Sequence, residues 1–501
     1  MTAAMVWWGV AIYVIVSLVL AYYSRTGKAV DMTDYFLGNR KMGGFVSALS
    51  YSATTYSAFM LVGLAGLTYA GGVGALGFEL IYLAGVSLIV FFGPRFWLAG
   101  KKYGYVTPTE MLGDRYNSKA VAVVTSLASC IFLIPYSAVQ LTGVGYLLSS
   151  MSDNVISFTT GVTIAAILAI VFTMIAGIRS VMWTDALQAI VMIVTATLVV
   201  LIVISTLGGF GTFFNTLATD HPGSLAVPGK GFFSFPTFLS LTLPWIFFCI
   251  SNPQVSQRLY MPASFSSMRR MLLGFLVFGF IYTLVSIIWG YAALIKFPNL
   301  ENADLATPTL LSSDVVPPVL ALVVMLGIMA AAISTIDSII LTLSSLISRD
   351  VYRNAAKHAT DKRQLLVGKI VIPIITILAY LFAQLQLDLI AVLSVSASAG
   401  LLVIVPAYVG VFFWKRGTAA GVLTSVVLSG LLVAFLELTK IKPFGYGSGV
   451  WGFLLSIVLF IAVSAVTSAP TEKANHFIHD LNSELRNKKR KTALSNHGKI
   501  V

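Results

Sequence analysis

The sequence predicts an all-α membrane protein with about thirteen transmembrane helices. The chain of 501 residues is 57% hydrophobic and only 10% charged, whereas soluble domains are about 25% charged. Its mean hydropathy is +0.90, and apolar runs long enough to cross a bilayer recur along the chain. These observations exclude a soluble protein with buried helices.

The expected spans are separated by short polar loops. They cover residues 5–23, 45–70, 76–97, 120–150, 156–178, 185–207, 235–257, 271–295, 312–347, 366–384, 388–412, 418–438 and 448–468. We interpret the first span as a retained helix and not as a signal peptide, because no basic segment precedes it and no A-x-A site closes it.

The distribution of basic residues predicts the orientation of these spans. With the N-terminus outside, 28 of the 32 Lys and Arg fall in cytoplasmic loops or in the tail. The other four are Lys230, Lys296, Lys440 and Lys442. The positive-inside rule therefore predicts a multi-pass protein of the cell (inner) membrane with its C-terminus in the cytoplasm. The net charge of +13 then reflects topology and contact with membrane lipid, not binding of nucleic acid.

Two groups of five spans, residues 45–207 and 235–412, predict an inverted repeat. Because five is odd, the second group begins from the opposite side of the membrane. Residues 1–44 add an N-terminal helix and a cytoplasmic loop, and residues 413–470 add two helices. The basic cytoplasmic tail, 471–501, is expected to be disordered or partly helical.

Each predicted repeat opens with a helix that the sequence interrupts. Hydroxyl side chains crowd the stretch from Ser47 to Ser57, and Ser251-Asn252-Pro253 breaks the helix that contains Trp245. Interrupted helices at matching places in two halves are typical of a transporter binding site.

A small-residue face in the span 312–347 suggests a cation site. Ala331, Ser334 and Thr335 share one side of the helix. Hard cations prefer several oxygen ligands, and two hydroxyls with the carbonyls of a broken neighbouring helix could provide them. Alternatively, the hydroxyls bond carbonyls of their own helix within a packing face. The residues alone leave both interpretations open.

Four of the 19 acidic residues fall within spans. Glu79 and Glu437 lie near outer ends, where we expect them to reach water. Asp185 and Asp337 lie in the cytoplasmic half, with no Lys or Arg expected at their depth. Such acids mark an ion pathway, or they hydrogen-bond neighbouring helices.

The remaining reactive side chains, those of cysteine and histidine, do not form a cluster. Cys130 and Cys249 lie in separate apolar runs, and all five histidines fall in loops or in the tail. The sequence therefore predicts no disulfide framework, no metal other than sodium, no cofactor and no enzyme activity.

Five motifs point to a known family. They are Asp34–Arg40, Ala48–Gly66, Gly177–Gln188, Pro253–Tyr260 and Ala330–Tyr352. With these motifs the chain resembles the sodium/solute symporter family, which includes sodium/proline and sodium/pantothenate permeases and sodium/glucose cotransporters. The resemblance implies a LeuT-like core of five plus five helices and sodium-coupled import of a small organic solute by alternating access, with a monomer sufficient for transport.

The resemblance also implies site residues. The sodium ligands would be the carbonyls of Ala53, Tyr56 and Ala331 and the hydroxyls of Ser334 and Thr335. Asp185, and with it Asp337, would lie on the ion pathway. The substrate-binding residues would be Thr55, Ser57, Ala58, Trp245, Cys249 and Pro253.

The chain departs from the proline permeases at two of these positions. Those proteins have an aspartate where this chain has Thr55 and a tyrosine where it has Cys249. The implied pocket contains no basic or acidic residue, so a polyamine would be unpaired there. We expect an anionic or zwitterionic solute: a monocarboxylate, pantothenate or an amino acid such as proline. The alternatives are a proton-coupled porter of the same fold and a transporter-like membrane sensor.

Overall fold

The computed structural model describes residues 2–24, 31–57, 59–386 and 390–497, and every extended element within these ranges is helical. Nine helices in these ranges are long and apolar enough to cross a membrane, or eleven if each of two bent pairs is one span. Ala3–Val19 and Phe235–Ile246 are shorter apolar helices. The all-α membrane fold is thus confirmed, and the count of thirteen spans stays a prediction.

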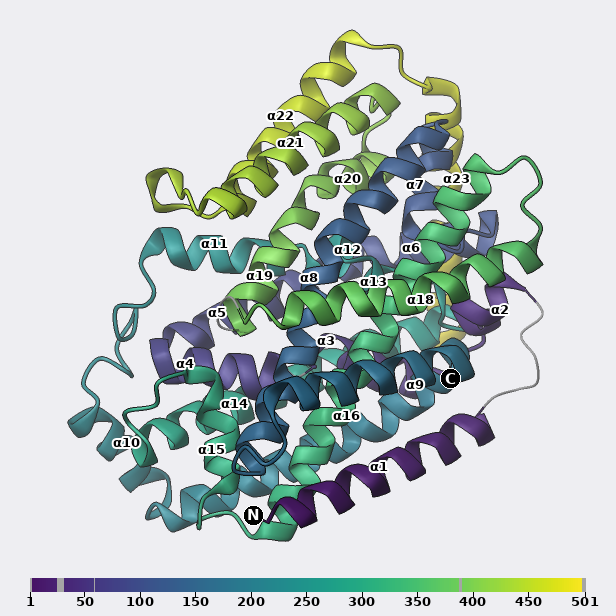
Figure 1. Cartoon of the computed structure of the whole chain (residues 1–501). Coiled ribbons are helices and arrows are strands. Elements are labelled where there is room, and N and C mark those ends of the chain that lie inside the picture. The colour runs from purple at the N-terminus through teal and green to yellow at the C-terminus, as the bar shows by residue number, and fades with distance from the viewer. Residues whose placement is uncertain (1, 25–30, 58, 387–389, 498–501) are drawn as a thin grey trace.

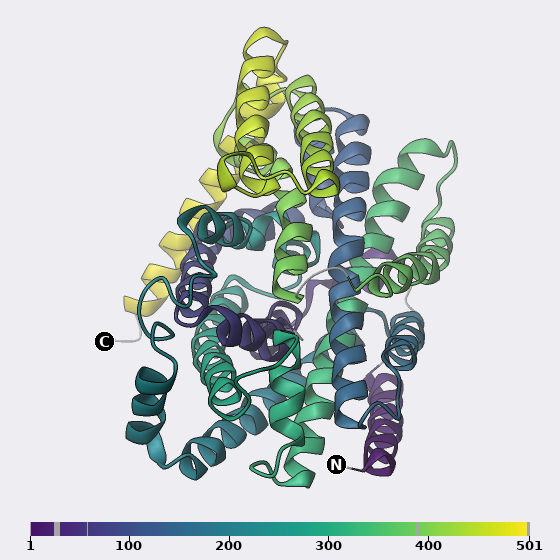
Figure 2. The ribbon, with the colours of Figure 1, turned by 60° about the vertical axis from the view of Figure 1, so that its left-hand side comes forward.

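The long helices follow the order of the expected spans (Figures 1 and 2). They are α1 (Ala3–Ser24), α3 (Gly44–Thr55) with η2 (Phe59–Leu64) and α4 (Ala65–Gly71), α5 (Gly74–Val86) with α6 (Leu88–Tyr103), α8 (Lys119–Met151), α9 (Phe158–Thr206), α11 (Phe235–Ile246), α14 (Phe265–Lys296), α16 (Pro318–Leu346), α18 (Asp361–Ala383), α19 (Ile390–Leu401) with α20 (Val405–Phe413), α21 (Ala419–Thr439) and α22 (Ser448–Val466).

Shorter elements connect them. They are α2 (Met32–Leu37), η1 (Gly38–Arg40), α7 (Pro108–Arg115), α10 (Gly209–Asp220), α12 (Phe248–Ser251), α13 (Pro253–Ser256), η3 (Gln257–Tyr260), η4 (Ala303–Leu305), α15 (Ala306–Ser312), η5 (Ile347–Tyr352), α17 (Arg353–Ala355), η6 (Leu402–Ile404), η7 (Pro443–Gly445) and the tail helix α23 (Thr471–His497).

The structure contains both of the helix breaks that the sequence suggested. The first separates α3 from η2 and α4, whose axes differ by 48°. The second separates α12 from α13 at Asn252, whose ψ of 110° is extended. Pro253 causes this break, because the residue before a proline is driven out of the helical region.

Two details of the spans differ from the expectation. The span 76–97 is not one straight helix but the pair α5 and α6, bent by 40°. The spans 156–178 and 185–207 correspond to two apolar helices, Phe158–Ile175 and Gly177–Thr206, but they join directly within α9 by a turn at Gly177, without the expected loop. Gly177 has φ +58°, ψ 177°, a conformation that glycine alone adopts readily, so a sharp change of direction needs only one residue.

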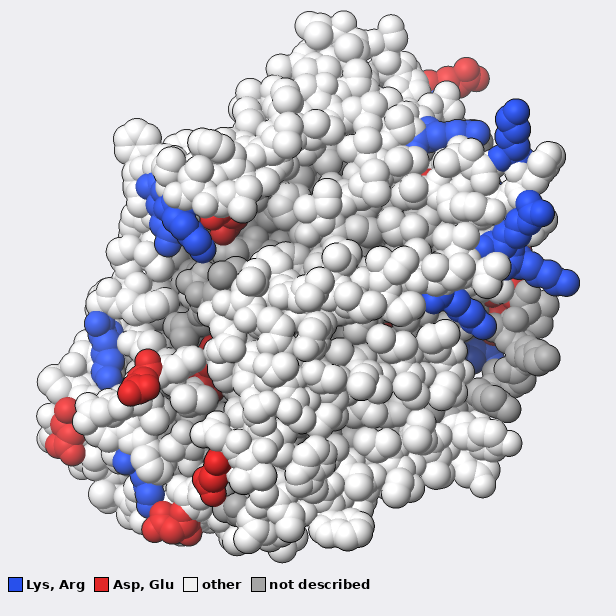
Figure 3. Space-filling model, in the orientation of Figure 1, with Lys and Arg blue, Asp and Glu red and all other residues white. Residues whose placement is uncertain are grey.

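The interior of the bundle is built around α16. It packs against α3, α8, α9 and α18, and 72% of its most apolar stretch is buried, against 28% for α18. The α21–α22 hairpin lies at the edge (top of Figure 1). Charged side chains leave a broad uncharged band between two ends of the molecule in Figure 3, as expected for a surface that faces lipid.

Glycines on α14 let the first broken helix pack closely. A Cβ at Gly279 would collide with the Tyr56 hydroxyl, and one at Gly290 would collide with the carbonyl oxygen of Ala65. These two contacts lie on opposite sides of the break. A single continuous helix therefore supports both halves of the interrupted one.

The tail is helical from Thr471 to His497, so of the two expected states the partly helical one is correct. Phe477 and Leu481 are buried, and the Phe477 ring stacks on Tyr103 at 5.2 Å. Asp480 pairs with Lys102 at 2.6 Å. The helix is thus held against the ends of α6 and α7.

Candidate functional site: an ion-sized oxygen cluster and a buried polar exit

Oxygen atoms of α3 and α16 converge at the first helix break. The Thr335 hydroxyl lies 2.9 Å from the carbonyl oxygen of Ala331 and 3.2 Å from that of Ala53. The Ser334 hydroxyl lies 3.2 Å from the same Ala331 oxygen. A hydroxyl that donates its proton to a carbonyl still has lone pairs to offer a cation. The packing interpretation and the cation-site interpretation are therefore compatible.

Tyr56 lies at the end of α3. Its N–H donates to the carbonyl of Ser52 at 2.7 Å, and its φ and ψ of −98° and 60° leave the helical region. The carbonyls of the last turn consequently lack their usual helical donors. The Tyr56 ring stacks on Phe275 at 5.1 Å, which anchors the backbone of the break against α14.

Asp185 on α9 is paired with a buried cation, which corrects the sequence analysis. The Arg258 Nη2 atom lies 3.1 Å from the Asp185 Oδ2 atom, and both side chains are buried, with exposures of 2% and 0%. The expectation that no Lys or Arg reaches this depth is wrong. Arg258 was assigned to a loop, but the short turns after Pro253 carry it back into the bundle.

Hydroxyls connect this ion pair to the other core helices. The Ser50 hydroxyl donates to the Asp185 Oδ2 atom at 2.6 Å, and the Arg258 guanidinium bonds both Ser50 and Ser338. Ser338 in turn lies 3.4 Å from the Thr54 hydroxyl. A continuous polar path therefore leads from the oxygen cluster toward the Arg258–Asp185 pair.

Asp337 lies beside this path. It is 4% exposed, and its Oδ1 atom accepts a hydrogen bond from Thr173 at 3.0 Å. Thr173 belongs to the first part of α9, whereas Asp185 belongs to the second part. Asp337 therefore contacts the first part of α9, whereas Asp185 belongs to its second part.

The expected substrate residues surround an aromatic cluster on the second broken helix. Trp245 stacks on Phe248 at 4.6 Å and lies 4.9 Å from Phe59 and 5.2 Å from Tyr82 between ring centres. Cys249 is buried one residue after Phe248. Helix α13, which begins at Pro253, contacts α3.

The other expected substrate residues lie at the first break. The Thr55 hydroxyl donates to the carbonyl of Tyr51 at 2.7 Å. The Ser57 hydroxyl accepts from the Phe59 N–H at 3.4 Å, and both residues are buried. Ala58 lies outside the described residues.

Glu79 on α5 is a candidate that the sequence analysis missed. It is fully buried, and neither carboxylate oxygen has a hydrogen-bond partner among the described residues. Its neighbours on α5, Phe78 and Tyr82, both contact Trp245. The expectation that Glu79 reaches water is wrong. Its neighbours Phe78 and Tyr82 could have indicated this burial, because large aromatic residues exclude solvent.

Further unpartnered polar atoms lie on the second broken helix and on α8. The Trp245 indole N–H and the Gln254 amide are buried without hydrogen-bond partners in the described part of the chain, as are the Tyr136 hydroxyl and the Gln140 amide on α8. Tyr136 reaches the cluster through Phe248, at 6.1 Å between ring centres. Buried polar groups are normally bonded, so this region has the donors and acceptors to hold a polar ligand.

Glu437 behaves differently from Glu79. It is half-buried and accepts a hydrogen bond from Ser448. It lines a pocket of about 430 Å³ with Lys440 and Lys442 between α11, α19 and the α21–α22 turn.

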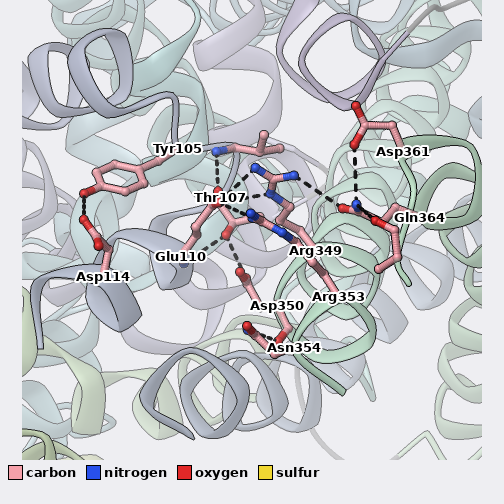
Figure 4. A network of polar contacts seen from close by, with 12 residues as sticks. Tyr105, Thr107, Glu110, Asp114, Arg349, Asp350, Arg353, Asn354, Asp361 and Gln364 are labelled. Atoms are coloured by element: carbon pink, nitrogen blue, oxygen red, sulfur yellow. Dashed lines mark hydrogen bonds and ion pairs between the residues drawn. The ribbon is translucent and has the colours of Figure 1, made fainter. Parts of the chain in front are cut away.

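A second polar network joins α7 to the end of α16 (Figure 4). Glu110 pairs with Arg349 at 3.0 Å and with Arg353 at 2.9 Å. Asp350 accepts hydrogen bonds from Thr107 at 2.7 Å and from Thr109 at 2.6 Å. This network fixes the connection between α6 and α8 to η5 and α17, which continue from the end of α16.

Comparison with solved structures identifies the fold. A sodium-coupled sialic acid symporter in a substrate-bound outward-open state aligns with a TM-score of 0.79 and 20% identity, over 93% of this chain and 99% of that chain. A nucleobase-cation-symport-1 family transporter aligns with a TM-score of 0.58 and 14% identity, over 89% and 98%. The LeuT-like fold is therefore confirmed, while the inverted repeat stays a prediction.

Comparison with characterised sequences gives transporters over nearly the whole chain. The sodium/pantothenate symporter of Haemophilus influenzae is 28% identical over 92% of this chain and 96% of its own. That of Escherichia coli is 27% identical over 90% and 94%. The sodium/proline symporter of Staphylococcus aureus is 24% identical over 92% of each chain.

The family model supports the same assignment as the motifs. The model of the sodium:solute symporter family matches residues 35–429, a range that contains the oxygen cluster, the Arg258–Asp185 pair and the aromatic cluster. Sodium is the coupling ion of this family. The chain belongs to the sodium:solute symporter family.

Proposed function

We propose that this protein imports a small zwitterionic solute together with sodium, by alternating access across the cell (inner) membrane. The observation that carries the sodium site is the convergence of the Thr335 hydroxyl on the carbonyls of Ala53 and Ala331. Ser334 and the Tyr56 carbonyl complete the proposed ligand set. These oxygens are uncharged and buried, which suits a dry monovalent cation.

The preference for a zwitterion rests on Glu79. A buried carboxylate without a partner is costly, and an ammonium group of the solute would pair with it. The faces of Trp245 and Tyr82 would add cation–π attraction. The unpartnered Trp245 N–H and the Gln254 amide would bind the carboxylate of the solute. An amino acid or a betaine fits these groups better than a simple monocarboxylate.

A second candidate is coupling to protons, and the same residue supports it. An unpaired acid within the membrane is a common proton carrier. Uptake into proteoliposomes separates the two candidates. We expect an inward sodium gradient to drive uptake of a zwitterion, and a pH gradient without sodium to drive none. Uptake that follows the pH gradient alone would contradict the sodium assignment.

The predicted topology defines the direction of import. We propose that the N-terminus lies outside. The chain then crosses or flanks the membrane in five segments: residues 1–44, 45–207, 235–412, 413–470 and 471–501. Cysteines introduced at positions 220 and 302 should react in intact cells, and cysteines at 265 and 357 should react only after permeabilisation. Labelling at 357 in intact cells would invert the topology and with it the assigned exit side.

The remaining proposals concern partners. A monomer is sufficient, because every residue of the proposed sites comes from one chain. Among the described residues, no group of three or more His, Cys, Asp or Glu is placed to hold a metal ion. The proposed partners are sodium, the solute and the surrounding lipid, and the proposed transport involves no enzymatic step.

A further inference from the structure

Arg258 makes contacts that the transport site itself does not require. Its guanidinium bonds Ser50 on α3, Asp185 on α9 and Ser338 on α16. Arg258 itself belongs to η3, which follows the second broken helix. One side chain therefore joins four core elements at a single point, at the end of the polar path that leaves the oxygen cluster.

The electrostatics of this point are unusual for a membrane protein. A charge buried to this extent is stable only when it is paired, and removing one partner of a buried pair is strongly destabilising. The Asp185 Oδ1 atom and the Arg258 Nε atom have no hydrogen-bond partner among the described residues. Asp185 thus has a free oxygen, which is the ligand type that sodium prefers.

The polar path from the oxygen cluster to Asp185 is short. Ser334 and Ser338 are one helical turn apart on α16, and Ser334 lies near the Asp185 carboxyl group. A sodium ion that leaves Thr335 toward the cytoplasm consequently meets the carboxylate that Arg258 holds. Two cations cannot share this carboxylate in a dry interior without strong repulsion.

We propose that Arg258 is an internal cation that takes the place of sodium beside Asp185, so that sodium release and cytoplasmic opening are one event. With Arg258 in place, α3 is tied to α9 and α16 and the exit is closed. When sodium moves to Asp185 it displaces the guanidinium, which frees Ser50 and Ser338 and lets α3 separate. Arg258 is a positioning residue that acts through Asp185, and its role rests on the proposed sodium symport.

The test uses the full-length protein in proteoliposomes and three substitutions. Arg258→Gln removes the cation and leaves Asp185 unpaired. The double variant Arg258→Gln with Asp185→Asn replaces the pair with two neutral amides, so that folding does not depend on an unpaired charge. Arg269→Gln removes an exposed arginine on α14 and serves as the matched control.

The first measurement is sodium efflux without solute. We expect the double variant to leak sodium at least about tenfold faster than the wild type and the control, because no charge pair closes the exit. Arg258→Lys, which keeps the charge but cannot bridge three helices, should leak at an intermediate rate. Leak of the double variant equal to that of Arg269→Gln would overturn the proposal.

The second measurement separates gating from stability. In a background without Cys130 and Cys249, we introduce Ser47→Cys on α3, where the serine is 1% exposed. A membrane-impermeant thiol reagent on the cytoplasmic side should label it several-fold faster in the double variant than in the control. A merely structural role would lower the thermal unfolding temperature without raising this labelling rate in the folded protein, and that result would also overturn the proposal.

The third measurement distinguishes this inference from the proposed function. Sodium chloride should raise the unfolding temperature of the wild type relative to choline chloride. If it does not, sodium binding fails and Arg258 has no ion to replace. If it does, and the variants neither leak nor expose α3, only the role of Arg258 fails.

Discussion

The oxygen cluster joins the first broken helix to α16, the aromatic cluster joins the second broken helix to α5, and the polar atoms of the two clusters are bonded differently. At Thr335 the hydroxyl already contacts two carbonyls within 3.2 Å. At Trp245 the indole N–H, the Glu79 carboxylate and the Gln254 amide have no hydrogen-bond partner in the described residues. The first region therefore keeps its shape alone, whereas the second needs water or a ligand to complete its hydrogen bonds.

Thr335→Ala is the strongest test of this difference between the oxygen cluster and the aromatic cluster. The substitution removes a hard oxygen from a site with few ligands, and we expect the sodium concentration for half-maximal uptake to rise by about tenfold or more. Uptake measured against sodium concentration checks it. Ser334→Ala should act in the same direction with a smaller shift, because its contact with the Ala331 carbonyl is longer, 3.2 Å against 2.9 Å.

Thr376→Ala is the matched control for Thr335→Ala. Thr376 on α18 is buried and donates to the carbonyl four residues earlier at 2.9 Å, as Thr335 does, but it faces no broken helix. Its removal should leave sodium dependence unchanged. An equal shift in both variants would mean that the effect comes from helix packing and not from a lost sodium ligand.

Glu79→Gln tests the second region. The substitution keeps the volume but removes the negative charge, so affinity for a zwitterion should fall by about tenfold, while sodium dependence changes little. Relief of a buried unpaired charge should also raise the unfolding temperature of the protein without solute. Glu437→Gln, at the half-buried outer acid, should change neither. Unaltered zwitterion affinity in Glu79→Gln would move the ammonium site elsewhere.

Asp304 lies in the short element η4 and is expected to give the smallest effect on stability of the substitutions considered. Its Oδ2 atom accepts from the Ile390 N–H at 2.8 Å while Oδ1 has no partner in the described residues. Burial raises the pKa of Asp304 from 3.8 to about 7. The folded protein therefore holds a proton that the unfolded chain has lost, and the stability from this group falls as the pH rises from about 4 to about 7.

Asp304→Asn should flatten this part of the stability profile. Unfolding temperatures measured in detergent at about pH 5 and about pH 8 give the comparison, because the asparagine does not titrate in this range. The wild type should lose more stability than the variant between the two values. Equal losses would assign the pH dependence to other groups.

The sequence predicted the parts of the fold that depend on local chemistry. Hydropathy located the spans, and Pro253 and the hydroxyl-rich stretch located both breaks, because these signals act within a few residues. The two spans around Gly177 were predicted, but a loop was expected between them, because an isolated glycine in an apolar run does not reveal its φ. The bend between α5 and α6 was missed because Ser87 is a single small polar residue in an apolar run and no proline lies next to it.

The residues of the candidate site divide in the same way, into those that local sequence reveals and those that depend on packing between distant segments. Ser334 and Thr335 were placed on one face from helical spacing alone, since a shared face follows from the helix period, and their assignment as sodium ligands came from the resemblance and stays a prediction. Arg258 was placed in a loop because the hydrophobic pattern ends before it, and only the path of α12, α13 and η3 shows that it turns inward. Glu79 was misplaced in depth, because its burial depends on how Phe78 and Tyr82 pack against Trp245 of α11.

The glycine contacts of α14 have a mechanical consequence. Tyr56 and Ala65 press against Gly279 and Gly290 of one uninterrupted helix, on either side of a break that would otherwise act as a free joint. A stiff rod that is clamped to both arms of a hinge transmits torque between them. Tilting of α4 is thereby carried to α3, although Tyr56 and Ser57 at the end of α3 are not helical.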